Sequence, residues 1–282
     1  MVIQDAIRAL VDRGPLTGSE TAAALEEIMT GNATPAQIGA FLAAMRLRGE
    51  TPEAIAAGLT VMQTHAEPCP VSDVIDICGT GGDGVDTINV STVAGFVVAA
   101  AGVRVAKHGN RAASSKCGSA DVLEALGARI DLGGEQVANV INSCGFGFLF
   151  AQRFHPAMRH VGGPRREIAV RTMFNILGPL SNPAKPRAQL VGVGARAIGP
   201  VVAEALALRG AGRAIVVHSN DGMDEISPAV ATHAWIVGDG AGTEREISPA
   251  DFGLATHPLS AVAGGEAQQN AGDILAILDG HD

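Results

Sequence analysis

Residues 74–101 read VIDICGTGGDGVDTINVSTVAGFVVAAA, and this stretch indicates the class of fold. The run Val74–Ile77 is short and β-branched, which is typical of a buried strand. Glycines follow it at once, and the residues from Thr92 to Ala101 have the character of a helix. The predicted order is therefore strand, glycine-rich loop and helix.

The alternation of strand and helix continues through most of the chain. Further strands are predicted at Val103–Ala106, Ala128–Asp131, Gln189–Val193, Ala214–His218 and His233–Val237. Segments rich in Ala and Leu separate these strands and have helical spacing. Because strands that alternate with helices build parallel sheets, we predict an α/β domain whose mostly parallel sheet is flanked by helices on both faces.

The N-terminal part of the chain is predicted to be entirely helical. Its apolar residues recur at intervals of three and four, as in Ala24–Met29. Thr17, Thr34 and Thr51 each precede a first turn that contains an acid, Gln or Pro, and such threonines are typical helix caps. Residues 1–70 are therefore predicted to form a small helical lobe.

A second helical section interrupts the strands between Pro156 and Pro186. The section from Arg165 to Leu177 is predicted to be helical, and residues 156–185 are expected to join the helical lobe. Residues 71–155 and 186–282 then make up the α/β domain. We expect a cleft between the two lobes.

Composition limits the classes of partner. A hydrophobic share of 47% over 282 residues is enough to bury a large core. The formal net charge of −9 argues against broad contact with a nucleic-acid backbone, which needs clustered Lys and Arg. Aromatic residues make up only 3%, so stacking platforms for bases are not expected. We predict no nucleic-acid partner.

The sequence also predicts a cytoplasmic location. Its four cysteines form no CxxC pair, and we expect them to be reduced thiols in a cytosol. The N-terminal MVIQDAIRAL lacks the features of a secretory signal. Apolar stretches such as Val93–Ala101 are too short to cross a bilayer, so no membrane partner is expected.

The first polar cluster combines Gly79–Asp83 with Asn89–Thr92. Glycines let backbone N–H groups approach an anion, and a following helix N-terminus adds unpaired donors. The alternative is a plain glycine-rich turn, since the spacing fits neither the GxGxxG nor the GxxxxGK[ST] motif. Polar residues at the helix entry favour a diphosphate cradle, although Ser91 and Thr92 would look the same as simple caps.

The second cluster runs from Lys107 to Ser115 and continues through Cys117–Asp121, again after a predicted strand. Two cations and several serines in an acidic protein suit a phosphate. A solvated basic turn is the alternative. His108 by itself indicates no catalytic role, because an isolated histidine is more often structural.

The third cluster is Asp221–Glu225, which follows the strand predicted at Ala214–His218. Adjacent carboxylates on an exposed loop at the edge of a sheet suit Mg²⁺, which is commonly held by carboxylates together with substrate phosphates. The alternative is a helix N-terminus enriched in acids.

The ordered set of motifs resembles the anthranilate phosphoribosyltransferases along nearly the whole chain. Each motif is modest, but their order is highly specific. The motifs are GTGGD (79–83), NVST (89–92), KHGNR (107–111), SS (114–115), CGSADVLEALG (117–127), RR (165–166), FNILGPLSNP (174–183) and DGMDE (221–225).

The resemblance implies that the chain transfers a phosphoribosyl group from phosphoribosyl pyrophosphate to anthranilate, in tryptophan biosynthesis. The contacts to phosphoribosyl pyrophosphate fall on Gly79, Gly82, Asp83, Thr87, Asn89, Val90, Ser91, Thr92, Lys107, Ser115 and Ser119. The anthranilate contacts fall on Gly79, Asn110 and Arg165, and the Mg²⁺ contacts on Ser91, Asp224 and Glu225. Lys107, Asn110 and Arg165 form the catalytic set.

The implied reaction needs no strong base, because an aryl amine is uncharged near neutrality and already nucleophilic. Positioning and electrostatics should dominate. Two other classes remain open. One is a pyrimidine nucleoside phosphorylase, although the sequences of those enzymes differ from this chain over Lys107–Ser119. The other is a non-catalytic relative that binds phosphoribosyl pyrophosphate or nucleic acid.

The family also implies a homodimer formed through the helical lobe. Its members usually continue well beyond the point that matches Asp279–Gly280, so this C-terminus is shorter than usual for the family.

Overall fold

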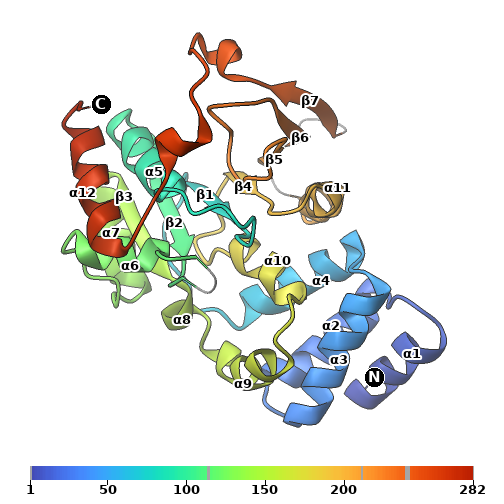
Figure 1. Ribbon diagram of the computed structural model, residues 1–282. Helices are drawn as coiled ribbons and strands as arrows, with labels where there is room; N and C mark the ends of the chain where they lie inside the picture. The colour runs from blue at the N-terminus through green and yellow to red at the C-terminus, as the bar shows by residue number, and fades with distance from the viewer. Residues whose placement is uncertain (1, 113–114, 211, 239–241, 282) are drawn as a thin grey trace.

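The structure is a computed structural model that describes residues 2–112, 115–210, 212–238 and 242–281. A group of helices at the N-terminus lies beside a larger part built on a seven-stranded sheet (Figure 1). This arrangement confirms the predicted fold class.

Four N-terminal helices form the helical lobe. Local capping fixes where three of them begin: Thr17 and Glu20 form a reciprocal capping box, as do Thr34 and Gln37, while the Thr51 hydroxyl accepts a bond from Ala54 N. The helix starts predicted at these threonines are therefore confirmed. The helices are α1 (Ile3–Asp12), α2 (Gly18–Met29), α3 (Pro35–Arg48) and α4 (Pro52–Thr64).

The helical section predicted from Arg165 to Leu177 is present, but it is divided between two helices. Helix α9 (Arg159–Ile168) ends at Ala169, which has a left-handed φ of 51°, and α10 (Met173–Leu180) begins after its own cap, Thr172. The spacing of the apolar residues did not predict this break, because a single left-handed residue leaves that spacing unchanged. Helix α9 packs on α2 and α3, and α10 packs on α3 and α4, so both contact the helical lobe.

The sheet has the order β3-β2-β1-β4-β5-β6-β7. Strands β1 to β5 run parallel to one another. Strand β6 is antiparallel to β5, and β7 is antiparallel to β6. Their bounds are β1 (Ile75–Gly79), β2 (Val105–Gly109), β3 (Phe146–Phe150), β4 (Ala188–Gly192), β5 (Arg213–Ser219), β6 (Thr232–Gly238) and β7 (Thr243–Ile247).

Five of the six predicted strands are confirmed, with small shifts of their ends. The strand predicted at Ala128–Asp131 is wrong: this segment is a loop in which only Ile130 is buried, while Arg129 pairs with Asp131. Strands β3 and β7 were not predicted. Strand β7 is an exposed edge whose sequence TEREI has no apolar face, and its pairing to β6 defines it.

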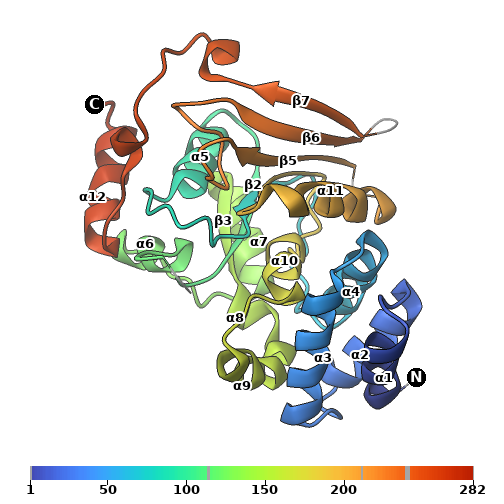
Figure 2. The same cartoon turned by 45° about the vertical axis from the view of Figure 1, so that its right-hand side comes forward.

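Helices cover both faces of the sheet, as predicted. Side chains of α5 (Val90–Ala100), α6 (Ser119–Ala125) and α12 (Ala267–Leu278) share one apolar cluster. On the opposite face, α7 (Gly134–Cys144) covers β2 and β3, and α11 (Gly199–Leu208) covers β4 to β6 (Figure 2). No helix within the described ranges is long and apolar enough to span a membrane.

The order of the strands fixes where a ligand can sit. From β1 the chain moves to β2 and β3 on one side, then returns to β4 on the other side of β1. A crevice forms at such a reversal, outside the carboxyl ends of the strands. The strand ends Gly79, Gly109, Gly192 and Ser219 all lie at this edge.

Candidate active site

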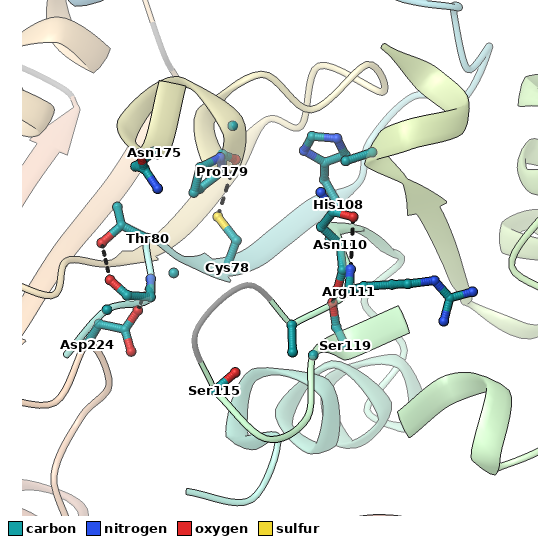
Figure 3. A pocket seen from close by; sticks show the side chains of 18 of the residues that line it. Cys78, Thr80, His108, Asn110, Arg111, Ser115, Ser119, Asn175, Pro179 and Asp224 are labelled. Carbon is teal, nitrogen blue, oxygen red and sulfur yellow. Dashed lines mark hydrogen bonds between the residues drawn. The ribbon is translucent and has the colours of Figure 1, made fainter. Parts of the chain in front are cut away.

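The three polar clusters of the sequence meet in one cavity of about 1080 Å³. The loops after β1, β2 and β5 line it from the sheet, and residues of α4, α9 and α10 line it from the helical side. Figure 3 shows part of this lining, with Thr80 and Asp224 on one flank and His108, Asn110 and Ser119 on the other.

All but one of the predicted site residues line this cavity. They are Gly79, Gly82, Asp83, Thr87, Asn89, Val90, Ser91, Lys107, Asn110, Ser115, Ser119, Arg165, Asp224 and Glu225. Thr92 is fully buried in the first turn of α5 and lies outside the lining. Its direct contact with a ligand stays a prediction. Ala113 and Ser114, which belong to the second cluster, lie outside the described residues.

The glycine-rich loop and the acidic loop hold each other. Gly81 and Gly82 have φ values of 61° and 74°, a conformation that other residues adopt at a cost. This turn lets Gly81 N donate to the Asp224 carboxylate at 2.7 Å. At Gly79, that carboxylate occupies the space that a Cβ would need, so the close approach requires glycine.

The acidic loop is partly buried, which corrects the expectation of an exposed loop. Burial and then the charge of Asp83 raise the pKa of Asp224 to about 6. Burial and then the charge of Asp224 raise the pKa of Glu225 to about 8. The third acid, Asp221, braces the loop instead, because it accepts hydrogen bonds from the hydroxyls of Ser219 and Ser227.

The donor set fits Mg²⁺ held mainly by a substrate. Glu225 accepts a backbone hydrogen bond from Ser91, and Ser91, Asp224 and Glu225 all line the cavity. Among the residues that the structure describes, no three His, Cys, Asp or Glu side chains converge on one point. Two carboxylates and a hydroxyl leave positions for water and phosphate oxygens, which is the usual coordination of Mg²⁺.

Lys107 is a buried cation beneath the cavity, with only 2% of its surface exposed. Its ammonium donates to the carbonyl of Ile77 at 2.7 Å and to the Ser91 hydroxyl at 2.9 Å. Burial lowers the pKa of Lys107, while the charge of Asp76 acts to raise it. Asp76 is itself fully buried and accepts a hydrogen bond from Asn182 at 2.8 Å.

His108 points to the opposite face from Lys107, because neighbours in a strand alternate. Its ring packs against His155, with 5.1 Å between the ring centroids. Burial, followed by the nearby His155, lowers the pKa of His108 to about 3. The ring is therefore neutral near pH 7. Its Nε2 has no hydrogen-bond partner among the described residues.

Arg165 reaches the cavity from α9 without a carboxylate partner in the described part of the chain. Its guanidinium donates to Asn175 Oδ1 at 3.3 Å and lies 5.7 Å from the centroid of the Phe174 ring. Burial, followed by the charge of Arg171, lowers its pKa. A half-buried cation of this kind is suited to pair with an anionic group of a ligand.

Asn110 links the second cluster to the residues that follow β3. Its Oδ1 accepts hydrogen bonds from Arg111 N at 2.8 Å and from Gln152 Nε2 at 3.3 Å. Its carbonyl accepts a bond from the Ser119 hydroxyl at 3.3 Å. The orientation of Asn110 is therefore set before any ligand binds.

Comparison with known proteins places the chain in a family. Residues 4–66 match the helical bundle domain of a glycosyl transferase family, and residues 71–282 match its a/b domain. The anthranilate phosphoribosyltransferase of Herpetosiphon aurantiacus is 49% identical over 284 residues, which cover 100% of this chain and 84% of that protein. The chain belongs to the anthranilate phosphoribosyltransferase family.

Solved structures of the family have the same fold. The enzyme from Thermus thermophilus superposes with a TM-score of 0.92 at 43% identity, covering 99% of this chain and 83% of that one. The Saccharomyces cerevisiae enzyme in complex with PRPP and Mg gives 0.89 at 29% identity, with coverage of 97% and 80%. A complex of the yeast enzyme with 4-fluoroanthranilate gives 0.86 at 28% identity, with coverage of 96% and 79%.

Sequence reasoning about this family member missed two side chains of the cavity. Arg171, between α9 and α10, donates to the carbonyl of Thr80 at 3.1 Å and so ties the helical side to the glycine-rich loop. Asn175 caps α10 and also accepts the bond from Arg165. Arg171 lies within the section that was predicted to be helical, and it stands in the break between α9 and α10. Asn175 lies in the FNILGPLSNP motif, which is part of the resemblance, but the resemblance assigns no ligand contact to Asn175.

Proposed function

We propose that the chain transfers the phosphoribosyl group of phosphoribosyl pyrophosphate to the amino group of anthranilate, giving N-(5-phosphoribosyl)anthranilate and pyrophosphate. One observation carries this proposal: a single cavity is lined by a glycine-rich anion loop on the sheet and by the cation Arg165, which has no carboxylate partner among the described residues, on the helical side. A phosphorylated sugar and an aromatic acid need these two features together.

The pyrophosphate end of the first substrate is proposed to lie at the loop after β1. Val90 and Ser91 line the cavity from the first turn of α5, and the N-terminal ends of helices favour anions. Lys107 beneath them and Ser119 across the cavity add a cation and a hydroxyl. Ser91, Asp224 and Glu225 would hold Mg²⁺, which neutralises charge on pyrophosphate when bound.

Anthranilate is proposed to bind with its carboxylate on Arg165 and its ring near Asn110. The amine nitrogen then forms a bond to C1 of the ribose as the bond from C1 to pyrophosphate oxygen breaks. The electron pair leaves with pyrophosphate, and the product amine gives its extra proton to water or to pyrophosphate. The residues act by holding both reactants in line and by stabilising the leaving charge.

The deciding assay mixes the purified protein with phosphoribosyl pyrophosphate, Mg²⁺ and anthranilate, and follows the loss of anthranilate fluorescence. We expect consumption that depends on all three. A folded protein that instead cleaves thymidine or uridine with inorganic phosphate would support the pyrimidine nucleoside phosphorylase and refute this proposal.

The role of Arg165 gives a prediction on substrate binding. Arg165→Ala is expected to raise the KM for anthranilate about ten- to more than a hundredfold, since a charge-assisted hydrogen bond contributes roughly 1.5–3 kcal/mol. The KM for phosphoribosyl pyrophosphate should change little. Arg245→Ala, at an exposed position of β7 outside the lining of the cavity, is the control. An effect of Arg165→Ala on the phosphoribosyl pyrophosphate KM alone would reverse the assignment.

The neutral state of His108 predicts that it is not the proton acceptor. With a pKa of about 3, the ring does not titrate between pH 6 and 8. His108→Asn is therefore expected to lower kcat by well under tenfold and to leave the pH profile unchanged, whereas general-base catalysis is worth about 10²–10⁴-fold. Circular dichroism first establishes that the variant is folded. A thousandfold loss together with the loss of a limb near the ordinary imidazole pKa would make His108 the base.

The remaining features of the proposal concern assembly and location. We propose a homodimer that covers exposed apolar side chains of the helical lobe, Val2, Val11 and Leu47, of which Leu47 is 87% exposed. Sedimentation velocity measures this state directly. A cytoplasmic location is supported by the four cysteines, all of which are free thiols.

A further inference from the structure

Both polar ends of the Asn89 side chain form hydrogen bonds with other parts of the protein. Its Nδ2 donates to the carbonyl of Cys117 at 3.2 Å. Its Oδ1 accepts the Cys117 thiol at 3.4 Å and Asn270 Nδ2 at 3.0 Å. Asn89 lines the cavity, and its amide is also a junction between three chain segments.

Asn270 is the most distant member of this junction. It lies 181 residues from Asn89, on α12, and is fully buried. Its Oδ1 accepts a bond from Gly265 N at 2.7 Å. Because that oxygen faces a donor and Asn89 Nδ2 faces a carbonyl, only one orientation of each amide satisfies the network. Both polar ends of Asn270 are thus committed, and such a buried amide is costly to disturb.

The segment before α12 also pairs with the loop that leads to Asn89. Ile88 N donates to Val262 O at 3.0 Å, and Gly264 N donates to Asp86 O at 2.9 Å. Thr87 forms an isolated bridge with Ala263. The approach is so close that a Cβ at Gly264 would meet the Thr87 carbonyl. Residues 262–270 therefore bind the loop 86–89 along its length.

We propose that Asn270 is a positioning residue for phosphoribosyl pyrophosphate. It holds Asn89, the N-cap residue of α5, and thereby fixes the place of Val90 and Ser91 in the lining of the cavity. Asn89 in turn holds the Cys117 backbone, two residues before Ser119. A single buried amide on α12 thus sets the relative placement of two phosphate-binding loops. This inference rests on the proposed function, since it assumes that phosphoribosyl pyrophosphate binds there.

The test is Asn270→Asp, which keeps the oxygen that accepts from Gly265 N but removes the donor to Asn89. The second carboxylate oxygen then faces Asn89 Oδ1. We expect the KM for phosphoribosyl pyrophosphate to rise about three- to tenfold, the range that corresponds to one neutral hydrogen bond. The KM for anthranilate should stay unchanged. Amide hydrogen exchange should accelerate in residues 84–92.

Ile274→Val is the matched control. Ile274 is fully buried in the packing of α12 on α6, and this change weakens the helix without touching Asn89. It is expected to lower the Tm and to leave both KM values unchanged. A folded Asn270→Asp protein with an unaltered KM for phosphoribosyl pyrophosphate, or an equal rise in Ile274→Val, would overturn the proposal.

Two further measurements keep the inference testable. If Asn270→Asp does not fold, Cys117→Ala removes another donor to Asn89 Oδ1, and the same KM should rise; no rise would count against the junction. Calorimetric titration of phosphoribosyl pyrophosphate without anthranilate should show the same weakening in Asn270→Asp. That titration separates the role of Asn270 from the proposed function, because the weaker binding of phosphoribosyl pyrophosphate is expected even if the wild-type protein uses a different acceptor.

Discussion

Replacing Asp224 by Asn and Glu225 by Gln together is expected to lower kcat/KM at ordinary Mg²⁺ concentrations by about a thousandfold or more. The amides keep the shape of the acidic loop but lose both charges proposed to hold the cation. Loss of metal-assisted stabilisation of a leaving phosphate oxygen is worth several kcal/mol, and each 1.36 kcal/mol is about a tenfold change in rate.

The same double variant should be at least as stable as the wild type at pH 8. Folding raises the pKa of Glu225 from 4.5 to about 8, so the folded state binds that proton more tightly than the unfolded state. Stability from this group is present below pH 4.5 and is lost as the pH rises towards 8. The amide side chains of the double variant do not ionise in this pH range, so the variant does not lose this stability.

Initial rates across a Mg²⁺ titration, together with thermal melting, check both statements. Glu246→Gln, an exposed acid on β7, is the control and should leave the rates unchanged. Near-normal turnover at ordinary Mg²⁺ in the folded double variant would remove the metal role from Asp224 and Glu225.

Lys107→Met is expected to lower the free energy of unfolding by about 3–5 kcal/mol and to impair use of phosphoribosyl pyrophosphate. Removal of one partner from a buried ionic group leaves the other charges uncompensated, which accounts for the loss of stability. The charges left behind include the fully buried Asp76 and the two acids of the metal loop.

A double-mutant cycle separates the structural role of Lys107 from its role in binding. Denaturant unfolding should show that Lys107→Met costs much less stability when Asp76→Asn is already present, because the uncompensated charge is gone. The activity should not return in the double variant. Both roles would be contradicted if Lys107→Met lowered the free energy of unfolding by less than about 1 kcal/mol and left the KM for phosphoribosyl pyrophosphate unchanged.

Local signals predicted the helical lobe and most of the sheet. Thr17, Thr34 and Thr51 cap helices through bonds within four residues, so the sequence alone carries that information. Strand β7 and the break between α9 and α10 depend on pairing to β6 and on one left-handed residue, Ala169. Neither leaves a periodic pattern.

The candidate site was predictable for a different reason. Parallel strands end at one edge, so polar residues after β1, β2 and β5 had to meet. The sequence could not show that Lys107 is buried and Glu225 partly buried, because burial depends on what α5 and the loops place above them. It also contained no sign of Arg171 or Asn270, whose partners lie far away along the chain.

The apolar core that begins in α1–α4 continues without a break into α11 and strands β4 and β5. Helix α4 packs on both α10 and α11, so the two family domains share this apolar core beside the cavity. A hinge between them would have to expose this shared interior. Substrates are therefore expected to enter by movement of the loops at the rim, and the two domains to unfold together in one cooperative transition rather than one after the other.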